Sequence, residues 1–155
     1  MTFHFPSPIR PSPIRPAPAP LAPAHLSAML PPSVLVDAAR CWRHARGQDR
    51  PTQPSLASCL DTLDCVVLAP VIDSFCLLFE GALGRPFRVG RSHSLSPDER
   101  LMVALLEGPA TRAAALPCEE PRGRLLDLAI RSTRIMVALT LKQTRRARAL
   151  TESPS

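Results

Sequence analysis

Apolar and polar residues alternate along most of the chain with the three- and four-residue spacing of amphipathic helices, which predicts a mainly helical protein. A first helix is predicted over residues 34–46 after a capping serine, Ser33, and a second helix after Ser55. Residues 48–54, which contain two prolines, are predicted to link them. The residues expected to face the core are Val34, Ala38, Cys41, Trp42 and Ala45 in the first helix and Leu56, Cys59, Leu60, Leu63 and Val67 in the second.

Residues 71–83 are apolar on nearly every side, which predicts a buried central helix that ends at Gly84. The segment 85–95 has no helical pattern and no partner run for a sheet, so it is predicted to be extended, either as a loop or as an isolated short strand.

The clearest helix start in the sequence is Ser96-Pro97-Asp98-Glu99, a capping box that begins a helix over 97–107. A short helix at 111–116 and a long one at 121–148 are predicted to follow. The residues expected on the buried side of the long helix are Leu125, Leu128, Ala129, Met136, Leu139 and Thr140. Together the patterns predict an all-α bundle of four to six helices over residues 33–148.

Prolines divide the chain into a tail and a domain. Ten of the nineteen prolines lie between Pro6 and Pro32, and at that density neither helices nor strands can propagate. Residues 1–32 are therefore predicted to be a disordered tail, and residues 149–155 a disordered C-terminus. Met29 stands where the composition changes, so an alternative is that the protein starts there and that residues 1–28 do not belong to it.

A short peptide motif lies within the tail. Arg10, Pro13 and Pro16 fit the pattern R-x-x-P-x-x-P, which aromatic grooves of other proteins bind as a polyproline II helix. The motif is a candidate binding site for another protein.

The formal net charge of +6 is unevenly distributed. Residues 1–32 carry +2, residues 33–143 carry fourteen basic and twelve acidic groups, and residues 144–155 carry +2. The domain is thus nearly balanced, and the basic excess lies at the two ends. A nucleic-acid partner is for this reason kept as an alternative.

Cysteine usage and hydropathy favour the cytoplasm. The five cysteines, Cys41, Cys59, Cys65, Cys76 and Cys118, are odd in number and include no C-x-x-C pair, so they are expected to be free core thiols. No secretory signal precedes them. The longest apolar run, Val66 to Ile72, is far shorter than the ~20 residues that span a bilayer, so no membrane partner is predicted.

No catalytic or metal-binding signature is evident. Cys41 and His44 lie three residues apart, but no spacing supplies the further ligands that zinc requires. His93 stands in a serine-rich loop without an identifiable catalytic partner. Glycine-rich phosphate loops and hydrolase motifs are absent from the sequence. A non-enzymatic protein without catalytic residues, cofactor or metal is therefore predicted.

Residues 97–134 are arranged like the opening of a helix-turn-helix. The passage Leu105-Leu-Glu-Gly-Pro-Ala-Thr111 resembles one found in winged-helix regulators, although acidic residues open the helix that would enter the groove. The basic residues that would contact nucleic acid in this alternative are Arg122, Arg124, Arg131, Arg134, Arg145, Arg146 and Arg148.

Residues 85–106, with Arg85-Pro-Phe-Arg-Val before the capped helix, resemble small uncharacterised helical proteins of GC-rich bacteria. The resemblance implies a helical fold and brings no activity. The sequence as a whole predicts a non-enzymatic interaction or regulatory protein that binds another protein, with a nucleic-acid-binding regulator as the alternative.

Overall fold

The fold is all-α, as predicted. A computed structural model describes residues 30–108 and 110–151, and these residues form six α-helices and one short 3-10 helix, with no strand. The elements are α1 (Pro32–Gly47), α2 (Thr52–Asp61), the 3-10 helix η1 (Val66–Leu68), α3 (Ala69–Leu83), α4 (Pro97–Glu107), α5 (Arg112–Ala115) and α6 (Glu120–Thr151). The candidate peptide motif at Arg10, Pro13 and Pro16 lies outside the described residues.

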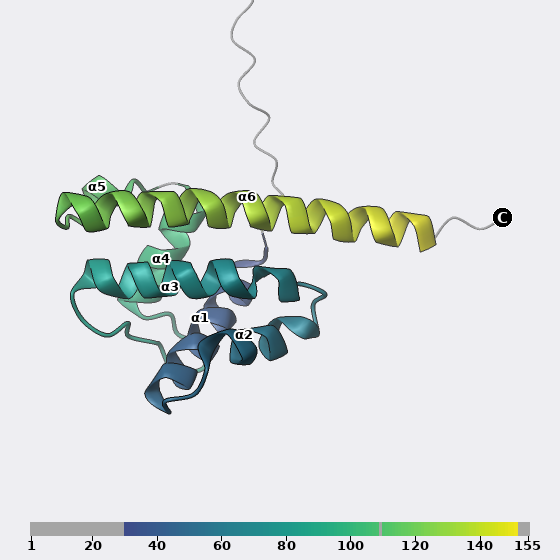
Figure 1. The fold of residues 1–155 in the computed structure, drawn as a ribbon, viewed down its shortest axis with the longest axis horizontal. Coiled ribbons are helices and arrows are strands. Elements are labelled where there is room, and N and C mark those ends of the chain that lie inside the picture. Colours follow the sequence, from purple (N-terminus) through teal and green to yellow (C-terminus); the bar gives the residue numbers. More distant parts are fainter. Residues whose placement is uncertain (1–29, 109, 152–155) are drawn as a thin grey trace, which may run out of the picture.

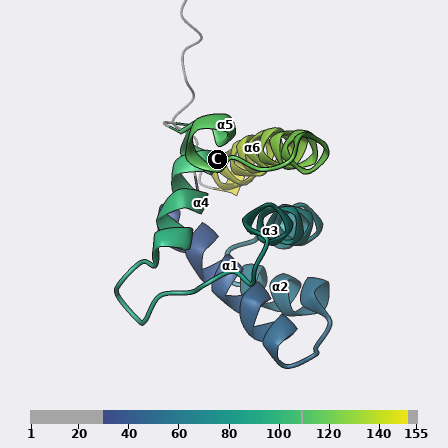
Figure 2. The same cartoon turned by 90° about the vertical axis from the view of Figure 1, so that its left-hand side faces the viewer.

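The helix α3 is central, again as predicted. It runs antiparallel to α6 and also packs against α1 and α2, which lie on its other side (Figure 1). Seen end-on, α4 and α5 stand beside the stack of α3 and α6 (Figure 2). The C-terminal part of α6 extends well past the other helices (Figure 1). The helix α3 ends as predicted at Gly84, which has a φ of 64°. The α3–α4 connection contains no strand, so of the two forms predicted for it, a loop or an isolated short strand, it is the loop.

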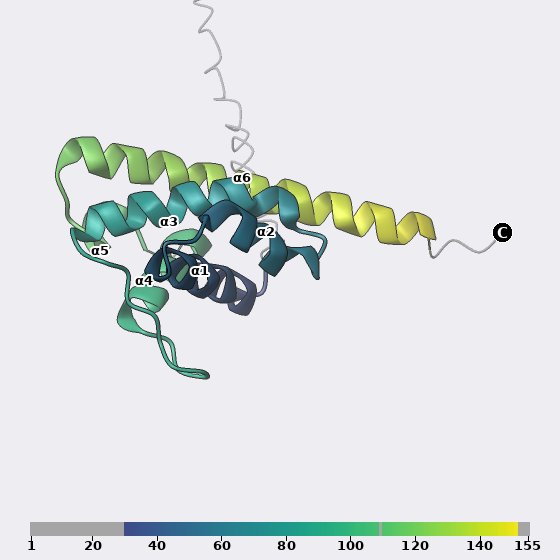
Figure 3. The ribbon, with the colours of Figure 1, turned by 60° about the horizontal axis from the view of Figure 1, so that its bottom comes forward.

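Aromatic side chains hold the core together. The Phe75 and Phe79 rings stack with centroids 5.7 Å apart, and Phe87 meets Phe79 edge-on at 5.8 Å. Trp42 is fully buried, and its indole N–H donates to Asp73 Oδ1 over 2.7 Å. Because Phe87 belongs to the α3–α4 connection, this long loop is anchored in the core, although its tip extends from the body (Figure 3).

Two predicted helix starts are wrong. The first helix begins at Pro32 after Pro31, so that Ser33 lies inside it and makes no capping bond. The second begins at Thr52 after Pro51, and the Ser55 hydroxyl donates to the Pro51 carbonyl oxygen instead. In α1 Pro32 occupies the first helical position, whereas in α2 Pro51 is the N-cap residue just before it. Neither proline costs a hydrogen bond, because the first N–H groups of a helix have no partner within the helix. The predicted linker 48–54 is correspondingly shorter.

The predicted ends and faces of two helices also need correction. The second helix ends at Asp61, so that Leu63 and Val67 lie outside it and are exposed. In α6 the residues Leu125, Leu128 and Leu139 were expected in the core but are half-exposed or more. The buried face of α6 consists instead of Leu126, Ala129, Ile130, Thr133, Val137 and Thr140. It includes two threonines, whose hydroxyls donate to Ala129 and Met136 carbonyls, so its apolar pattern is weak in the sequence.

The capping box at α4 is confirmed, and it forms part of a buried polar cluster. The Glu99 carboxylate is 0% exposed and accepts hydrogen bonds from Arg40 Nε (2.7 Å), Ser96 N (2.7 Å) and Gly90 N (3.0 Å). Burial raises the pKa of Glu99, but these donors outweigh burial and hold the pKa below its usual value. We call Arg40, Arg85, Ser96, Asp98 and Glu99 the polar clamp, because they fasten α4 and the α3–α4 loop to α1.

Asp98 makes the second half of the clamp. Both of its carboxylate oxygens accept from Arg85, over 2.6 and 2.7 Å, and one also accepts from Arg88 N. The hydrogen bond with Arg85 is the main reason that the pKa of Asp98 is lowered. Gly90 is required here because a Cβ at this position would overlap the Ser94 carbonyl oxygen and press on Glu99.

Replacing Ser96 with alanine should lower the free energy of unfolding by about 2 kcal/mol. The Ser96 hydroxyl accepts from Glu99 N and donates to the Arg88 carbonyl oxygen, so both bonds are lost inside a buried cluster. Urea denaturation measures the effect. The control is Ser33→Ala, which should change stability by less than about 0.5 kcal/mol. Equal effects of the two substitutions would contradict the assigned helix starts.

Acid should destabilise the protein through the clamp. Because the pKa values of Asp98 and Glu99 are lowered in the folded state, the unfolded chain binds more protons, and stability falls as the pH drops below about 5. Urea denaturation between pH 7 and pH 3 should show a shallower pH dependence for Glu99→Gln than for the wild type. The exposed control Glu107→Gln should keep the wild-type slope.

Candidate protein-binding surface

The side of α6 that faces away from the bundle is apolar. Leu125, Leu128, Ile135 and Leu139 are between 50% and 60% exposed, and we call these four residues the outer stripe. Their positions differ by three, seven and four residues, which places all four along one side of the helix. The exposed Ser132 falls at the remaining position of this series.

The outer stripe faces solvent because another face of α6 fits the core better. Leu126, Ile130 and Val137 are at most 7% exposed and pack into the bundle, where α6 meets α3 and α4. Apolar residues therefore occupy two faces of one helix, although only one is needed for folding. Single exposed leucines are common in soluble proteins, but four on one helix face form a patch of the kind that marks interaction sites.

A surface cavity of about 530 Å³ borders the outer stripe. It lies between α6 and the turn that joins α4 to α5. Its lining includes Gly108, Thr111, Arg112, Asp127, Arg131, Arg134 and Ile135, the last of which belongs to the stripe. The cavity thus combines an apolar edge with three guanidinium groups.

Two of these three arginines are occupied by the fold. Arg112 donates to both oxygens of Asp127, and this bond raises the pKa of Arg112. Arg134 donates to the carbonyl oxygens of Leu105 and Leu106 and so satisfies the C-terminal end of α4. The side chain of Arg131 has no ion-pair partner in the described part of the chain. It is the basic group beside the stripe that remains available to another molecule.

The positive charge of the protein is concentrated on α6. This helix carries eight basic and two acidic residues, whereas the rest of the chain has eleven of each. Both acids of α6 are paired, Glu120 with Arg124 and Asp127 with Arg112. Counted along the sequence, the excess of positive charge falls at the two ends of the chain. In the fold, the excess carried by the described residues lies on a single helix.

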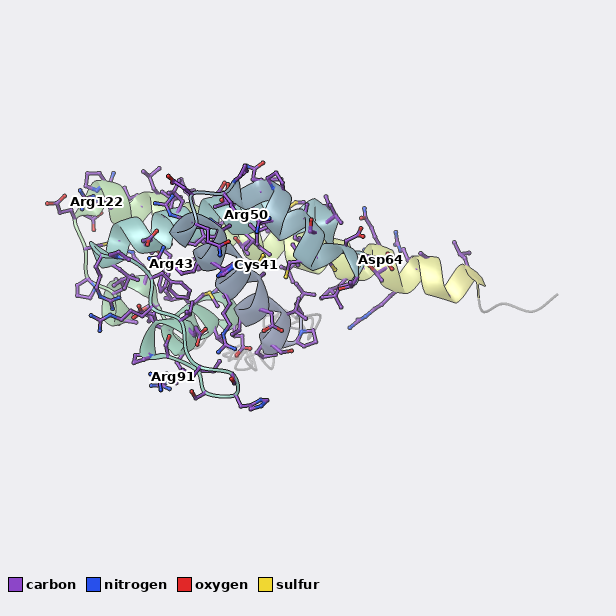
Figure 4. All side chains as sticks on the ribbon, turned by 90° about the horizontal axis from the view of Figure 1, so that it is seen from below. Cys41, Arg43, Arg50, Asp64, Arg91 and Arg122 are labelled. Atoms are coloured by element: carbon purple, nitrogen blue, oxygen red, sulfur yellow. The ribbon has the colours of Figure 1, made fainter. Side chains whose placement is uncertain are left out.

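The basic residues of the nucleic-acid alternative all lie on α6 but do not form one contact surface. Arg134 is engaged with α4 and Arg124 with Glu120. Arg122 is exposed near the start of the helix (Figure 4), and Arg145 and Arg146 are exposed toward its end. The Arg148 side chain lies outside the described ones. The helix-turn-helix interpretation fits poorly for two reasons. The helix α5 has only four residues. The next helix, α6, would have to enter the groove, but its outer face presents leucines where a groove-binding helix needs polar groups.

The histidines singled out in the sequence lie apart from this surface. His93 is exposed in the α3–α4 loop, where Arg91 also points away from the body (Figure 4). The carbonyl oxygens of the neighbouring residues Ser92 and Ser94 accept hydrogen bonds from Arg40. His44 is exposed on α1. Among the described residues no group of three or more His, Cys, Asp or Glu side chains is placed to hold a metal ion.

Among the described residues one helical stretch, Val66–Leu83, is long and apolar enough to cross a membrane by length and composition, with a mean hydropathy of 1.9 and 33% of it buried. The same stretch supplies Phe75 and Phe79 to the core and packs against α6, α2 and α1. Core helices of soluble proteins pass this test as well.

Comparisons with protein-family models, curated proteins and solved structures find no match to this chain.

The two faces of α6 predict opposite effects for neighbouring leucines. Leu126→Ala should lower the free energy of unfolding by about 2–4 kcal/mol, because it opens a cavity in the core. Leu128→Ala should change it by less than about 0.5 kcal/mol. Thermal or urea denaturation distinguishes them, and a large loss for Leu128→Ala would show that the outer stripe belongs to the core.

Proposed function

We propose that this protein is a non-enzymatic interaction protein that binds a helical segment of another protein along the outer stripe of α6. The observation that carries the proposal is the exposed outer stripe beside Arg131, which has no ion-pair partner among the described residues. The expected partner is an amphipathic helix with its own apolar stripe and with acidic residues beside it. A regulatory role in the cytoplasm is part of the same proposal.

The spacing of the outer stripe suits a helix as partner. Two series of positions with a seven-residue spacing run along the stripe. One consists of Leu125, Ser132 and Leu139, and the other, offset by three residues, consists of Leu128 and Ile135. This is the a and d pattern by which two helices pack knobs into holes. The stripe extends over about four turns of α6, a length on which a partner helix has several contact points.

Charge determines which helix fits. Arg124 and Arg131 lie seven residues apart along one edge of the stripe, and Arg145 continues that edge after Ala138. In the packed pair these positions face the edge of the partner helix. Glutamate or aspartate there would pair with Arg131, whereas lysine or arginine would be repelled.

A second copy of this chain fits less well. In an antiparallel pair the edge with Arg124 and Arg131 would face itself, which sets arginine against arginine. In a parallel pair it would face the other edge of the stripe, where the accessible residues Met136 and Gln143 carry no acid. The same charges therefore favour a different, acidic partner.

Nucleic acid remains the second candidate because α6 carries the whole net charge of the chain. The two candidates use different parts of the helix. A protein partner depends on the outer stripe, while phosphate contacts depend on the exposed arginines and lose affinity steeply with salt, at a slope of about −0.9 per contact.

Fluorescence anisotropy with synthetic probes tests the proposal on the full chain. One labelled peptide carries leucine at the a and d positions of three heptads and glutamate beside them, and a matched peptide carries lysine in place of glutamate. The glutamate peptide should bind, and the lysine peptide should bind at least about tenfold more weakly. Leu128→Asp combined with Ile135→Asp should weaken binding at least about tenfold, because it places charges in the apolar contact.

Leu95→Asp serves as the control, since Leu95 is an exposed leucine in the α3–α4 loop. Binding that survives the double substitution, or no binding of the glutamate peptide, contradicts the proposal. Self-association in sedimentation equilibrium that the double substitution abolishes would identify a second copy as the partner. Tight, salt-sensitive binding of duplex DNA that is unchanged by the double substitution in the outer stripe would favour the nucleic-acid alternative.

A further inference from the structure

Two thiols meet where α1 packs against α2. The Cys41 thiol, on α1, donates to the Ser55 carbonyl oxygen of α2 over 3.2 Å. Figure 4 shows Cys41 on the side of α1 next to α2. The helices are in extensive contact and are joined by a tight connection of four residues, 48–51.

The position of Cys41 brings it next to Cys59. In an α-helix the carbonyl oxygen of Ser55 accepts from the backbone N–H four residues later, which is that of Cys59. A side chain in a helix also leans back toward the preceding turn, so the Cys59 thiol extends toward the carbonyl that Cys41 contacts. Burial, together with the neighbouring Cys41 thiol, raises the pKa of Cys59.

This pair differs in accessibility from Cys65 and Cys76. Cys41 and Cys59 are both partly exposed, and Cys41 lines a surface cavity of about 290 Å³ together with His44, Arg50 and Ser55. A small oxidant can therefore reach it. Cys65 and Cys76 are buried, and burial strongly raises the pKa of Cys76.

We propose that Cys41 and Cys59 form a reversible disulfide when the protein meets a low-molecular-weight disulfide such as oxidised glutathione. The Cys41 thiolate attacks one sulfur of glutathione disulfide, forms a mixed disulfide and releases one glutathione thiolate, which takes up a proton. The Cys59 thiol loses its proton to water, and the resulting thiolate attacks the Cys41 sulfur and releases the second glutathione as a thiolate, which takes up a proton. The two cysteines are oxidised by two electrons, and glutathione disulfide is reduced by two.

The disulfide would join α1 to α2 across their connection. In a reducing cytoplasm it is absent at rest and forms under oxidation, as is typical of transient intracellular disulfides. The pair lies on the side of α3 opposite α6, so the site is independent of the outer stripe.

The test incubates the folded full-length protein with oxidised glutathione, blocks the remaining thiols with iodoacetamide and maps them by mass spectrometry. Trypsin together with an Asp-specific protease places Cys41, Cys59, Cys65 and Cys76 on separate fragments. The expected product is one fragment pair that links Cys41 to Cys59, lacks two hydrogen atoms and separates again with dithiothreitol.

Three variants sharpen the result. Cys41→Ser and Cys59→Ser should each lose the linked pair and instead retain glutathione on the remaining cysteine of the pair. Cys118→Ser is the control, because Cys118 is also partly exposed but lies between α5 and α6, and it should leave the linked pair unchanged. The proposal is overturned if Cys41 and Cys59 are both alkylated after oxidation, if a stable glutathione adduct persists on wild-type Cys41, or if Cys59 links to Cys65 instead.

Discussion

The arrangement of the helices depends on the buried carboxylate of Glu99. A charge removed from water in this way is tolerated only when donors surround it, and here Arg40, Ser96 and Gly90 supply them from α1, the α4 N-terminus and the α3–α4 loop. The interaction thereby fixes the start of α4 against α1. At the other end of α4, Arg134 of α6 binds the final carbonyl oxygens. One helix held at both ends thus sets how α6 lies on the bundle.

That orientation is why the protein has an unoccupied apolar face. Once Arg134 is held by α4 and Leu126, Ile130 and Val137 are packed in the core, the outer stripe must point to solvent. Such a face has a cost in solubility, which the eight basic residues of α6 offset. We propose that the same residues restrict which helix can cover the stripe, which would link stability, solubility and partner choice on one element.

Helix types and several boundaries could be predicted from sequence, because local chemistry determines them. Ser96, Pro97 and Glu99 specify a helix start within four residues, and Gly84 marks an end. The side of α6 that is buried could not be predicted, because Leu125 and Leu126 are equally apolar and lie on neighbouring faces. The choice depends on distant contacts with α3 and α4. The ion pair between Glu99 and Arg40 could not be predicted either, because the two residues are 59 positions apart and such a pairing has no sequence signature.

We propose that the outer stripe is a binding face for an acidic helix. The most direct measurement is a methyl NMR titration of the full chain, labelled at leucine and isoleucine, with the glutamate-flanked heptad peptide. We expect shifts concentrated on Leu125, Leu128, Ile135 and Leu139, with the signals of the buried Leu56 and Leu60 unchanged. Shifts centred on Leu63, Leu77 or Leu95, or no shifts at a saturating peptide concentration, would contradict it.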